Sequence, residues 1–204
     1  MSRVYFSSDW HLGHKNLSDF GQRPITDVKS NYEFIGDNYD LNKKDTLYLL
    51  GDIVFEPEAL EFIQTLPADK KHLVIGNHDW ERFNVNMFDL AKTFDSVLGI
   101  KSYGSSKQKT KSWLTHAPIH ESELRGKYFN VHGHIHTEDV NPEIRDNPSY
   151  INVNVDVLWP KYEKVIINWQ ELMQLHKSEF DNEWETKRNE RVEIIKSYRE
   201  YKRK

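Results

Sequence analysis

The sequence predicts an α/β fold in which helices cover the outside of β-sheets. Short apolar runs, rich in β-branched and aromatic residues, recur along the chain and stop abruptly at polar residues. Segments with a helical pattern lie between these runs. Runs of this length with such flanks are typical of buried strands, and their alternation with helices indicates an α/β architecture.

Five of the apolar runs are the strongest strand candidates, and two weaker candidates follow them. The five are residues 4–6, 46–50, 72–75, 113–115 and 128–131; the two are residues 150–155 and 164–167. A helix is predicted over residues 28–39 across the first gap. Another is predicted over residues 57–66, with Pro57 in its first turn and Glu58 and Glu61 near the positive end of its dipole. Asn168 followed by Glu171 predicts the cap of a last helix that runs, with breaks, toward the C-terminus.

Composition limits the class of protein. The 204 residues suit one domain, or one domain with an extension. The chain has no cysteine, which excludes disulfides, thiolate metal sites and a cysteine nucleophile, and agrees with a cytoplasmic location. No apolar run resembles a signal peptide or reaches the roughly 20 residues of a membrane span. The net charge of −4 argues against a protein that is basic overall and binds nucleic acid.

Two regions are nonetheless basic. One carries four lysines and no acid between residues 101 and 111, namely Lys101, Lys107, Lys109 and Lys111. The other is the tail after Trp184, which ends in Lys202, Arg203 and Lys204. Solvated surface is the simpler interpretation, and a surface that follows a polyanion is the alternative.

Each of the five strongest strand candidates ends in a cluster of Asp, Asn or His. These clusters are Asp9-x-His11, Gly51-Asp52, Gly76-Asn77-His78-Asp79, His116 and Gly133-His134-x-His136. Because α/β sheets bind ligands at the carboxyl ends of their strands, we expect the five clusters to converge. Single histidines elsewhere have a simpler explanation, so His72, His120 and His176 are expected to be structural. His132 is expected in the core or behind the ligands.

The residue types in these clusters predict a metal centre. Imidazole with carboxylate or amide oxygen, and without sulfur, suits Mn, Fe, Zn, Ni or Co. Residues two apart on extended backbone point to the same side, so both members of Asp9-x-His11 can reach one cluster. The glycines at 51, 76 and 133 permit tight turns close to the metals. Two metals about 3.5 to 4 Å apart would clamp a phosphoryl oxygen and activate a bridging water.

The ordered series DWH, GD, GNHD, TH and GHIH resembles the calcineurin-like metallophosphoesterase superfamily over residues 2 to about 170. Residues 8–16, Arg23-Pro24, residues 50–52 and residues 151–156 are similar to small single-domain phosphoesterases of bacteria and phages. The resemblance implies a four-layer α/β/β/α sandwich of two mixed β-sheets flanked by helices. It also implies a phosphoesterase domain at residues 1–170 with a charged helical extension at 171–204. We expect the extension to pack on the domain, with self-association as the alternative.

The resemblance also implies roles for individual residues. One metal would be held by Asp9, His11 and His136, and the other by Asn77, His116 and His134, with Asp52 bridging them. His78 would act as general acid or electrostatic stabiliser. Asp79 would orient that imidazole or cap a turn, with neither role favoured. His14, Asn16 and Arg23 are candidates for substrate binding, although His14 and Arg23 have surface or loop-bracing roles as equal alternatives.

The predicted function is therefore a phosphoesterase that uses two divalent ions, with Mn expected first and Fe, Ni, Zn or Co as alternatives. A phosphodiesterase acting on a nucleotide-like or nucleic-acid substrate is favoured, because the short chain suggests an open site. The alternatives are a phosphomonoesterase, including a nucleotide or protein phosphatase, a non-catalytic metal-binding scaffold, and a nucleic-acid binding module. No membrane partner is expected, and the protein would be a monomer or a homodimer.

Overall fold

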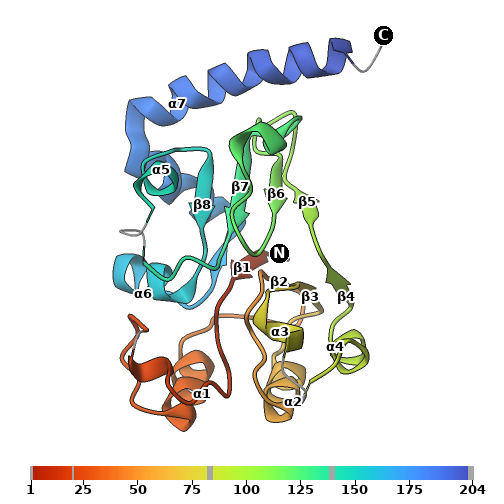
Figure 1. The fold of residues 1–204 in the computed structure, drawn as a ribbon, viewed down its shortest axis with the longest axis vertical. Helices are drawn as coiled ribbons and strands as arrows, with labels where there is room; N and C mark the ends of the chain where they lie inside the picture. The colour runs from red at the N-terminus through yellow and green to blue at the C-terminus, as the bar shows by residue number, and fades with distance from the viewer. Residues whose placement is uncertain (1, 20, 82–84, 138–140, 202–204) are drawn as a thin grey trace.

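Two β-sheets form the centre of the protein in a computed structural model that describes residues 2–19, 21–81, 85–137 and 141–201. The first sheet has the strand order β4-β3-β2-β1-β9 and the second has the order β5-β6-β7-β8 (Figure 1). The strands of the first sheet are β1 (Val4–Ser7), β2 (Thr46–Leu49), β3 (Lys70–Val74), β4 (Ser96–Leu98) and β9 (Ile167–Asn168). Those of the second are β5 (Lys101–Tyr103), β6 (Ser112–Leu114), β7 (Phe129–His132) and β8 (Tyr150–Asn152).

Helices flank the two sheets, which confirms the predicted sandwich architecture. They are α1 (Val28–Asp37), α2 (Pro57–Thr65), α3 (His78–Glu81), α4 (Met87–Thr93), α5 (Pro142–Arg145), α6 (Val155–Tyr162) and α7 (Trp169–Tyr201), with short 3-10 turns at Leu17–Asp19 and Glu121–Leu124. Strands β1 to β4 run parallel to one another, and so do β6 to β8, whereas β9 and β5 are antiparallel to their neighbours. Within each sheet the parallel strands therefore end at the same edge.

Strand alternation divides the apolar residues between two cores. In β2 and the residue after it, Leu47 and Leu49 belong to one buried cluster, whereas Tyr48 and Leu50 belong to the other. This period of two follows from the pleat, which points successive side chains to opposite faces. The first cluster contains residues of α1 and α2, and the second contains residues of both sheets and of α7. The first sheet is thus buried on both faces, which explains why its central strands β1 and β2 are almost continuously apolar.

The helix starts follow the signals in the sequence. Asp27 caps α1 by accepting a hydrogen bond from the backbone N–H of Ser30, whose hydroxyl in turn accepts from the N–H of Asp27. Pro57 occupies the first turn of α2, where its missing N–H costs nothing. Asn168 accepts from the backbone N–H of Glu171 at the start of α7. These three helices begin where they were predicted to begin.

Several elements differ from the prediction. The strand predicted at residues 150–155 ends at Asn152, because Asn154 caps α6 and accepts from the N–H of Asp156. The strand predicted at 164–167 is shorter and lies at Ile167–Asn168. The prediction also lacked α4, β4 and β5. These elements have only three to seven residues each, so their periodic signal is weak.

The C-terminal helix α7 packs on the domain as expected. Leu172, Trp184 and Ile195 are buried in the second core, and Arg191 donates to the carbonyls of Arg125 and Lys127. The helix is interrupted at Asp181, which has φ of 44°. The division of the chain at residue 170 stays a prediction. The basic residues 202–204 lie outside the described residues, and no described helix is long and apolar enough to cross a membrane.

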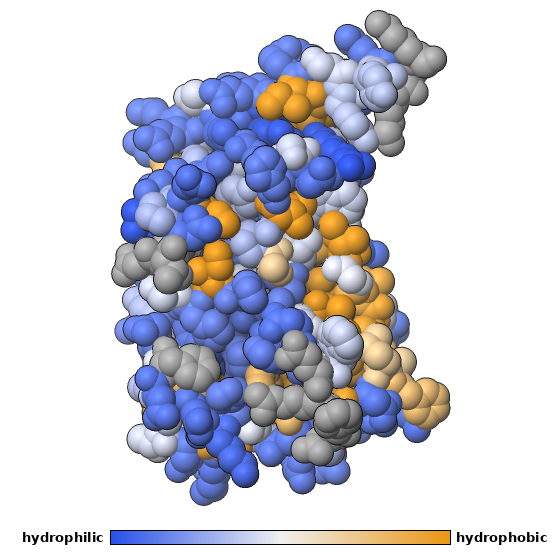
Figure 2. Space-filling view, in the orientation of Figure 1, coloured by the Kyte–Doolittle hydropathy of each residue, from blue (hydrophilic) through white to orange (hydrophobic). Residues whose placement is uncertain are grey.

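The surface agrees with the polar composition. Figure 2 shows a mostly hydrophilic face, with apolar side chains gathered over the side that carries β4 and β5. The large apolar residues that stay exposed include Met87 and Phe88 of α4 and Ile100 between β4 and β5. Met87, Phe88 and Ile100 are thus close in sequence to the edge strands β4 and β5.

Protonation of His176 is expected to loosen the packing of α7 below neutral pH. Its Nε2–H donates to the Pro148 carbonyl at 2.9 Å, and burial lowers its pKa to about 4. The unfolded chain protonates near pH 6.5, so this stability is complete above that pH and is lost between about pH 6.5 and 4. Urea unfolding should show that His176→Gln reduces the loss of stability between pH 7 and 5 by about 2 kcal/mol. The same change at exposed His120 should leave that loss unaltered, and equal behaviour of the two variants would contradict the assignment.

Candidate metal centre

The carboxyl ends of five parallel strands bring the predicted ligands together. Strands β1, β2 and β3 of the first sheet lead into Asp9 and His11, Asp52, and Asn77; strands β6 and β7 of the second lead into His116, His134 and His136. Two groups of side chains have ligand atoms within 4.8 Å of one another: Asp9, His11 and His136, and Asp52, His116 and His134. Each group takes residues from both sheets.

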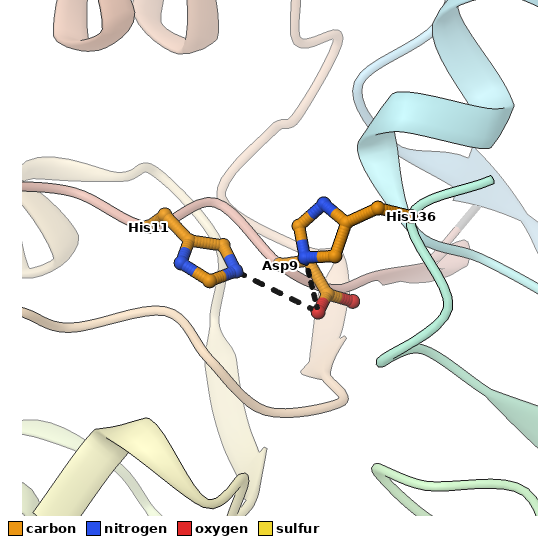
Figure 3. Close-up of side chains that lie close together, drawn as sticks. All are labelled: Asp9, His11 and His136. Carbon is orange, nitrogen blue, oxygen red and sulfur yellow. Dashed lines mark ion pairs between the residues drawn. The ribbon is translucent and has the colours of Figure 1, made fainter. Parts of the chain in front are cut away.

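The first group surrounds a fully buried carboxylate. In Figure 3, the Oδ1 atom of Asp9 lies 3.8 Å from His11 Nε2 and 3.6 Å from His136 Nε2. Asp9 also accepts the backbone N–H of His134 at 3.0 Å, which ties the end of β1 to the loop after β7. One carboxylate and two imidazoles thus face one another, and this donor set suits a borderline divalent cation.

The second group converges on one imidazole nitrogen. His116 Nε2 lies 3.2 Å from Asp52 Oδ2, 3.1 Å from Asn77 Oδ1 and 3.2 Å from His134 Nδ1. His116 Nδ1 donates to the Leu50 carbonyl at 2.8 Å, since a carbonyl only accepts, and Nε2 is thereby directed into the site.

These separations fit a bound metal. Ligands about 2.1 Å from an ion stand roughly 3.0 Å apart in an octahedral shell and roughly 3.4 Å apart in a tetrahedral one. A single proton on His116 Nε2 cannot satisfy three neighbouring lone-pair atoms, whereas a cation can. The residues therefore fit a divalent ion, and Asn77 joins the second group as predicted.

The backbone of the site is strained at the ligands. Asp9, His11, Asp52 and His134 have φ values of 58°, 49°, 55° and 69°, in the left-handed region that non-glycine residues rarely adopt. Such conformations cost of order 1 to 3 kcal/mol each and persist only where the surroundings enforce them. Here the backbone N–H groups of Asp9 and His11 donate to the carbonyls of Gly51 and Asp52, which ties the two loops together.

Two glycines allow the loops to approach the ligands closely. A Cβ atom on Gly76 would collide with the carboxylate of Asp52, and one on Gly133 would collide with Asp9 and with the Ser8 side chain. Glycine at these two positions therefore lets the loops approach the carboxylates, and the expected closeness of the turns to metals stays a prediction.

Charge interactions link the two groups. Burial alone would raise the pKa of Asp52, but the hydrogen bond and positive charge of His116 outweigh it and lower that pKa to about 2. Burial likewise opposes protonation of His116, yet Asp52 and Asp9 together raise its pKa. Both carboxylates are thus ionised at neutral pH and attract positive charge. The interaction of Asp9 with His116 crosses from one group to the other, as expected for two neighbouring cation sites.

His78 lies at the side of the first group, where the general acid was predicted. Its backbone N–H donates to Asp52 Oδ1 at 2.9 Å, and its ring centroid lies 6.1 Å from that of His11. Buried Phe55 packs against the rings of His78, His11 and His14, with centroid separations of 5.4, 4.8 and 4.9 Å. Phe55 thus forms an apolar wall for three imidazoles, and the polar pattern used on the sequence gave no signal for it.

His14 stays a candidate for substrate contact. It is partly exposed, its ring lies 5.7 Å from that of His11, and its Nδ1 accepts the backbone N–H of Asn16. Asn16 is exposed, and it bonds His14 through its backbone N–H and not through its side chain. Both residues follow directly on the first ligand cluster.

Asp79 is placed differently from the suggestion that it orients His78. Its two oxygens accept four backbone N–H groups, those of Asp52, Ile53, Val54 and Gly76. A carboxylate has about four lone-pair positions, and these bonds use them all. Asp79 therefore fixes the loop that carries Asp52, which agrees with the alternative expectation of a turn-capping residue.

Arg23 does not reach the substrate side, which corrects one of its two expected roles. Its side chain is fully buried, and its five N–H donors have acceptors on Asp156, Asn31 and the carbonyls of Asp9 and Trp10. No donor remains for a phosphate. Its partner Asp156 hydrogen-bonds His136 Nδ1 at 2.6 Å and had been given no role. The signal was present, since Asp156 follows a strand as the other acidic site residues do.

The two groups of Asp and His side chains between the sheets have the composition of sites that could hold divalent metal ions. The chain belongs to the calcineurin-like phosphoesterase family, whose model matches residues 2–197. The family resemblance predicted from the sequence is therefore confirmed. The match also reaches into α7, beyond the residues that carried that resemblance.

The chain is also similar to individual proteins of other organisms. The chain is 30% identical over 166 residues to the gene 66 protein of Mycobacterium phage L5, covering 67% of this chain and 79% of the phage protein. It is 27% identical over 168 residues to an uncharacterized protein of Methanocaldococcus jannaschii, covering 78% and 84% of the two chains. The crystal structure of a protein of unknown function from Aquifex aeolicus superposes with a TM-score of 0.66 at 28% identity, covering 86% of this chain and all of that one.

Proposed function

We propose that the protein is a phosphodiesterase that uses two divalent metal ions and acts on a nucleotide or nucleic-acid-like substrate. The observation that carries the proposal is the pair of Asp and His groups at one edge between the sheets, in a chain of the calcineurin-like phosphoesterase family. Asp9, His11 and His136 would hold one ion, and Asn77, His116 and His134 the other. Asp52 would bridge them.

The remaining site residues suit phosphate-ester hydrolysis. When bound, the two ions neutralise phosphoryl oxygens and lower the pKa of a water molecule so that it can attack phosphorus. His78 is half-buried beside the first group, where its imidazole can donate a proton to the leaving oxygen. Asp79 fixes the loop of Asp52, and Phe55 keeps the imidazoles in place. The chain's own contribution is therefore to orient the ligands and to hold a proton near the leaving group.

The accessibility of the candidate metal centre favours a phosphodiester over a phosphomonoester as the substrate. His134 is exposed, and the side chain of His136 is 22% exposed, so the centre can be reached by a substrate that extends beyond one phosphate. A phosphomonoesterase is the alternative within the same chemistry. Reconstituted protein should be assayed with Mn on bis-p-nitrophenyl phosphate, p-nitrophenyl phosphate, cyclic nucleotides and single-stranded DNA. We expect faster turnover of diesters, and a clear preference for p-nitrophenyl phosphate would contradict the diesterase proposal.

Two metals per chain are expected after reconstitution with Mn. The reason is that each group offers at least three ligand atoms, which is the minimum typical of a catalytic site. Elemental analysis of dialysed protein should give a stoichiometry near two, and His116→Ala should lower it toward one. A reproducible value near zero or one for the unmodified protein would defeat the dinuclear proposal.

Several finer predictions remain proposals. Mn is proposed from the mixed nitrogen and oxygen ligands, and a cytoplasmic location from the absence of cysteine. Binding of nucleic acid through the lysines of residues 101–111 is proposed only as a secondary contact. Lys109 and Lys196 line one surface hollow together with Glu190 and Glu193 of α7, so the charge of that surface is mixed. A non-catalytic scaffold is disfavoured because every predicted ligand is present.

A further inference from the structure

Asp156 holds His136 in a defined orientation. Its four lone-pair positions accept the backbone N–H of Gln22, two N–H groups of Arg23, and the Nδ1–H of His136 at 2.6 Å. The Nε–H and Nη2–H groups of the Arg23 guanidinium donate to the two oxygens of Asp156, so both oxygens are fixed as acceptors. An ionised carboxylate only accepts hydrogen bonds, so His136 must carry its proton on Nδ1. Its Nε2 then carries the lone pair and lies 3.6 Å from Asp9 Oδ1.

Arg23 connects the same carboxylate to the backbone segment that carries the other two residues of the first group. Its Nη2 donates to the carbonyl of Asp9 at 2.7 Å, and its Nη1 donates to the carbonyl of Trp10 at 3.1 Å. The strained segment that carries Asp9 and His11 is thus tied to the residue that orients His136. One buried guanidinium sets the relative positions of all three predicted ligands, although it contacts none of their ligand atoms.

We propose that Arg23 and Asp156 are positioning residues that fix the tautomer of His136 and the position of the Asp9 loop, and thereby set the metal affinity of the first site alone. The inference rests on the proposed metal-dependent function. The second group has a separate support, because His116 donates its Nδ1–H to the Leu50 carbonyl. Outer hydrogen-bonding partners of metal-binding histidines typically affect metal affinity by about 10- to 100-fold, which is the expected effect here.

Asp156→Asn is the sharpest test because it reverses the direction of the hydrogen bond to His136, while it also removes the bond that the same oxygen accepts from Arg23 Nη2. In this variant the Arg23 guanidinium should keep its hydrogen bond to the side-chain amide oxygen at position 156. The amide NH₂ group then faces the imidazole of His136. Nδ1 must then accept, and the proton moves to Nε2, where it blocks metal binding. Long-range ¹H–¹⁵N spectra of the metal-free protein report this tautomer directly. Arg23→Lys is the second variant: it keeps the charge but loses the planar fork that spans Asp156 and the Asp9 loop.

Asp45 provides a matched control, because it directly precedes β2 and lies at the opposite end of that strand from the predicted ligand Asp52. Asp45 is also fully buried, and it accepts from both the backbone and the guanidinium of Arg3. Asp45→Asn should destabilise the fold without changing the tautomer of His136 or the affinity for Mn. This control separates general destabilisation from the positioning role.

Calorimetric titration with Mn, together with the spectra, decides the proposal. We expect Asp156→Asn to shift the His136 proton to Nε2 and to weaken one of the two sites about 10- to 100-fold, with the other unchanged. We expect Arg23→Lys to weaken the same site. An unchanged tautomer with unchanged affinities, or equal weakening of both sites, would overturn the inference. If unmodified protein binds no Mn, the proposed function fails, whereas the tautomer comparison still tests the role of Asp156.

Discussion

Asp52→Asn is expected to abolish phosphoesterase activity and to weaken metal binding together. The substitution keeps the shape of the side chain but removes the negative charge that faces His116 Nε2 at 3.2 Å. The loss of affinity should exceed the roughly 10- to 100-fold typical for an outer hydrogen-bonding partner, because a proposed direct ligand of both ions is altered. Asparagine tolerates positive φ as aspartate does, so the φ of 55° at this position should be retained. Turnover and Mn affinity should be measured on the same preparation.

Asp45→Asn again supplies the control, since it removes a buried carboxylate near the start of β2, away from the proposed ligands at its other end. It should leave activity and metal binding intact. Ordinary turnover of Asp52→Asn at low Mn would show that the bridging assignment is wrong. Loss of metal from only one site would assign Asp52 to the second group alone.

His78→Asn is expected to lower kcat strongly while both metals stay bound. A general acid contributes about 10²- to 10⁴-fold in rate, equivalent to about 3 to 5 kcal/mol of barrier. The defect should depend on the ester. A p-nitrophenolate leaving group needs little protonation and should be affected less than an alkyl or nucleoside leaving group. Steady-state rates on a series of diesters with increasing leaving-group pKa would reveal this as a steeper dependence in the variant.

Two results would remove His78 from the proposed mechanism. Loss of a metal in His78→Asn would make the side chain a ligand, and an undiminished rate on a poor leaving group would make it a bystander. Asn16→Ala is a useful comparison, because this exposed residue lies near His14 and is not proposed to transfer a proton. It should raise KM, if it has any effect, and should not change the leaving-group dependence.

The sequence was most informative where strand ends carry polar clusters. Buried strands are recognised by their continuous apolar runs, and neighbouring parallel strands of one sheet end at the same edge, so the approach of the Asp9 loop to the Gly51-Asp52 loop was predictable from strand order. Individual hydrogen-bond partners were not predictable in this way. A carboxylate after a strand can face a metal, as proposed for Asp52, or the backbone, as Asp79 does. The difference depends on loop geometry that apolar patterning does not encode.

Arg23 shows the same limit for a charged residue. An arginine near a phosphate site suggests a phosphate ligand, yet this one is buried against Asp156, which is 133 positions away. Only the tertiary structure brings residues so distant in sequence together. The short edge strands β4 and β5 were missed for a related reason, because a strand of three partly exposed residues has almost no periodic signal.

Each candidate metal site draws residues from both sheets, and this has a consequence for folding. Asp9 and His136 lie 127 positions apart, so on the proposed assignment neither site exists until almost two thirds of the chain has been synthesised. Ions that bind only the folded chain shift the folding equilibrium by mass action, about 2.7 kcal/mol when free metal is 100 times the dissociation constant. The cellular supply of divalent metal would then govern the lifetime of the protein as well as its turnover, and chains made under metal limitation would be the first to be degraded.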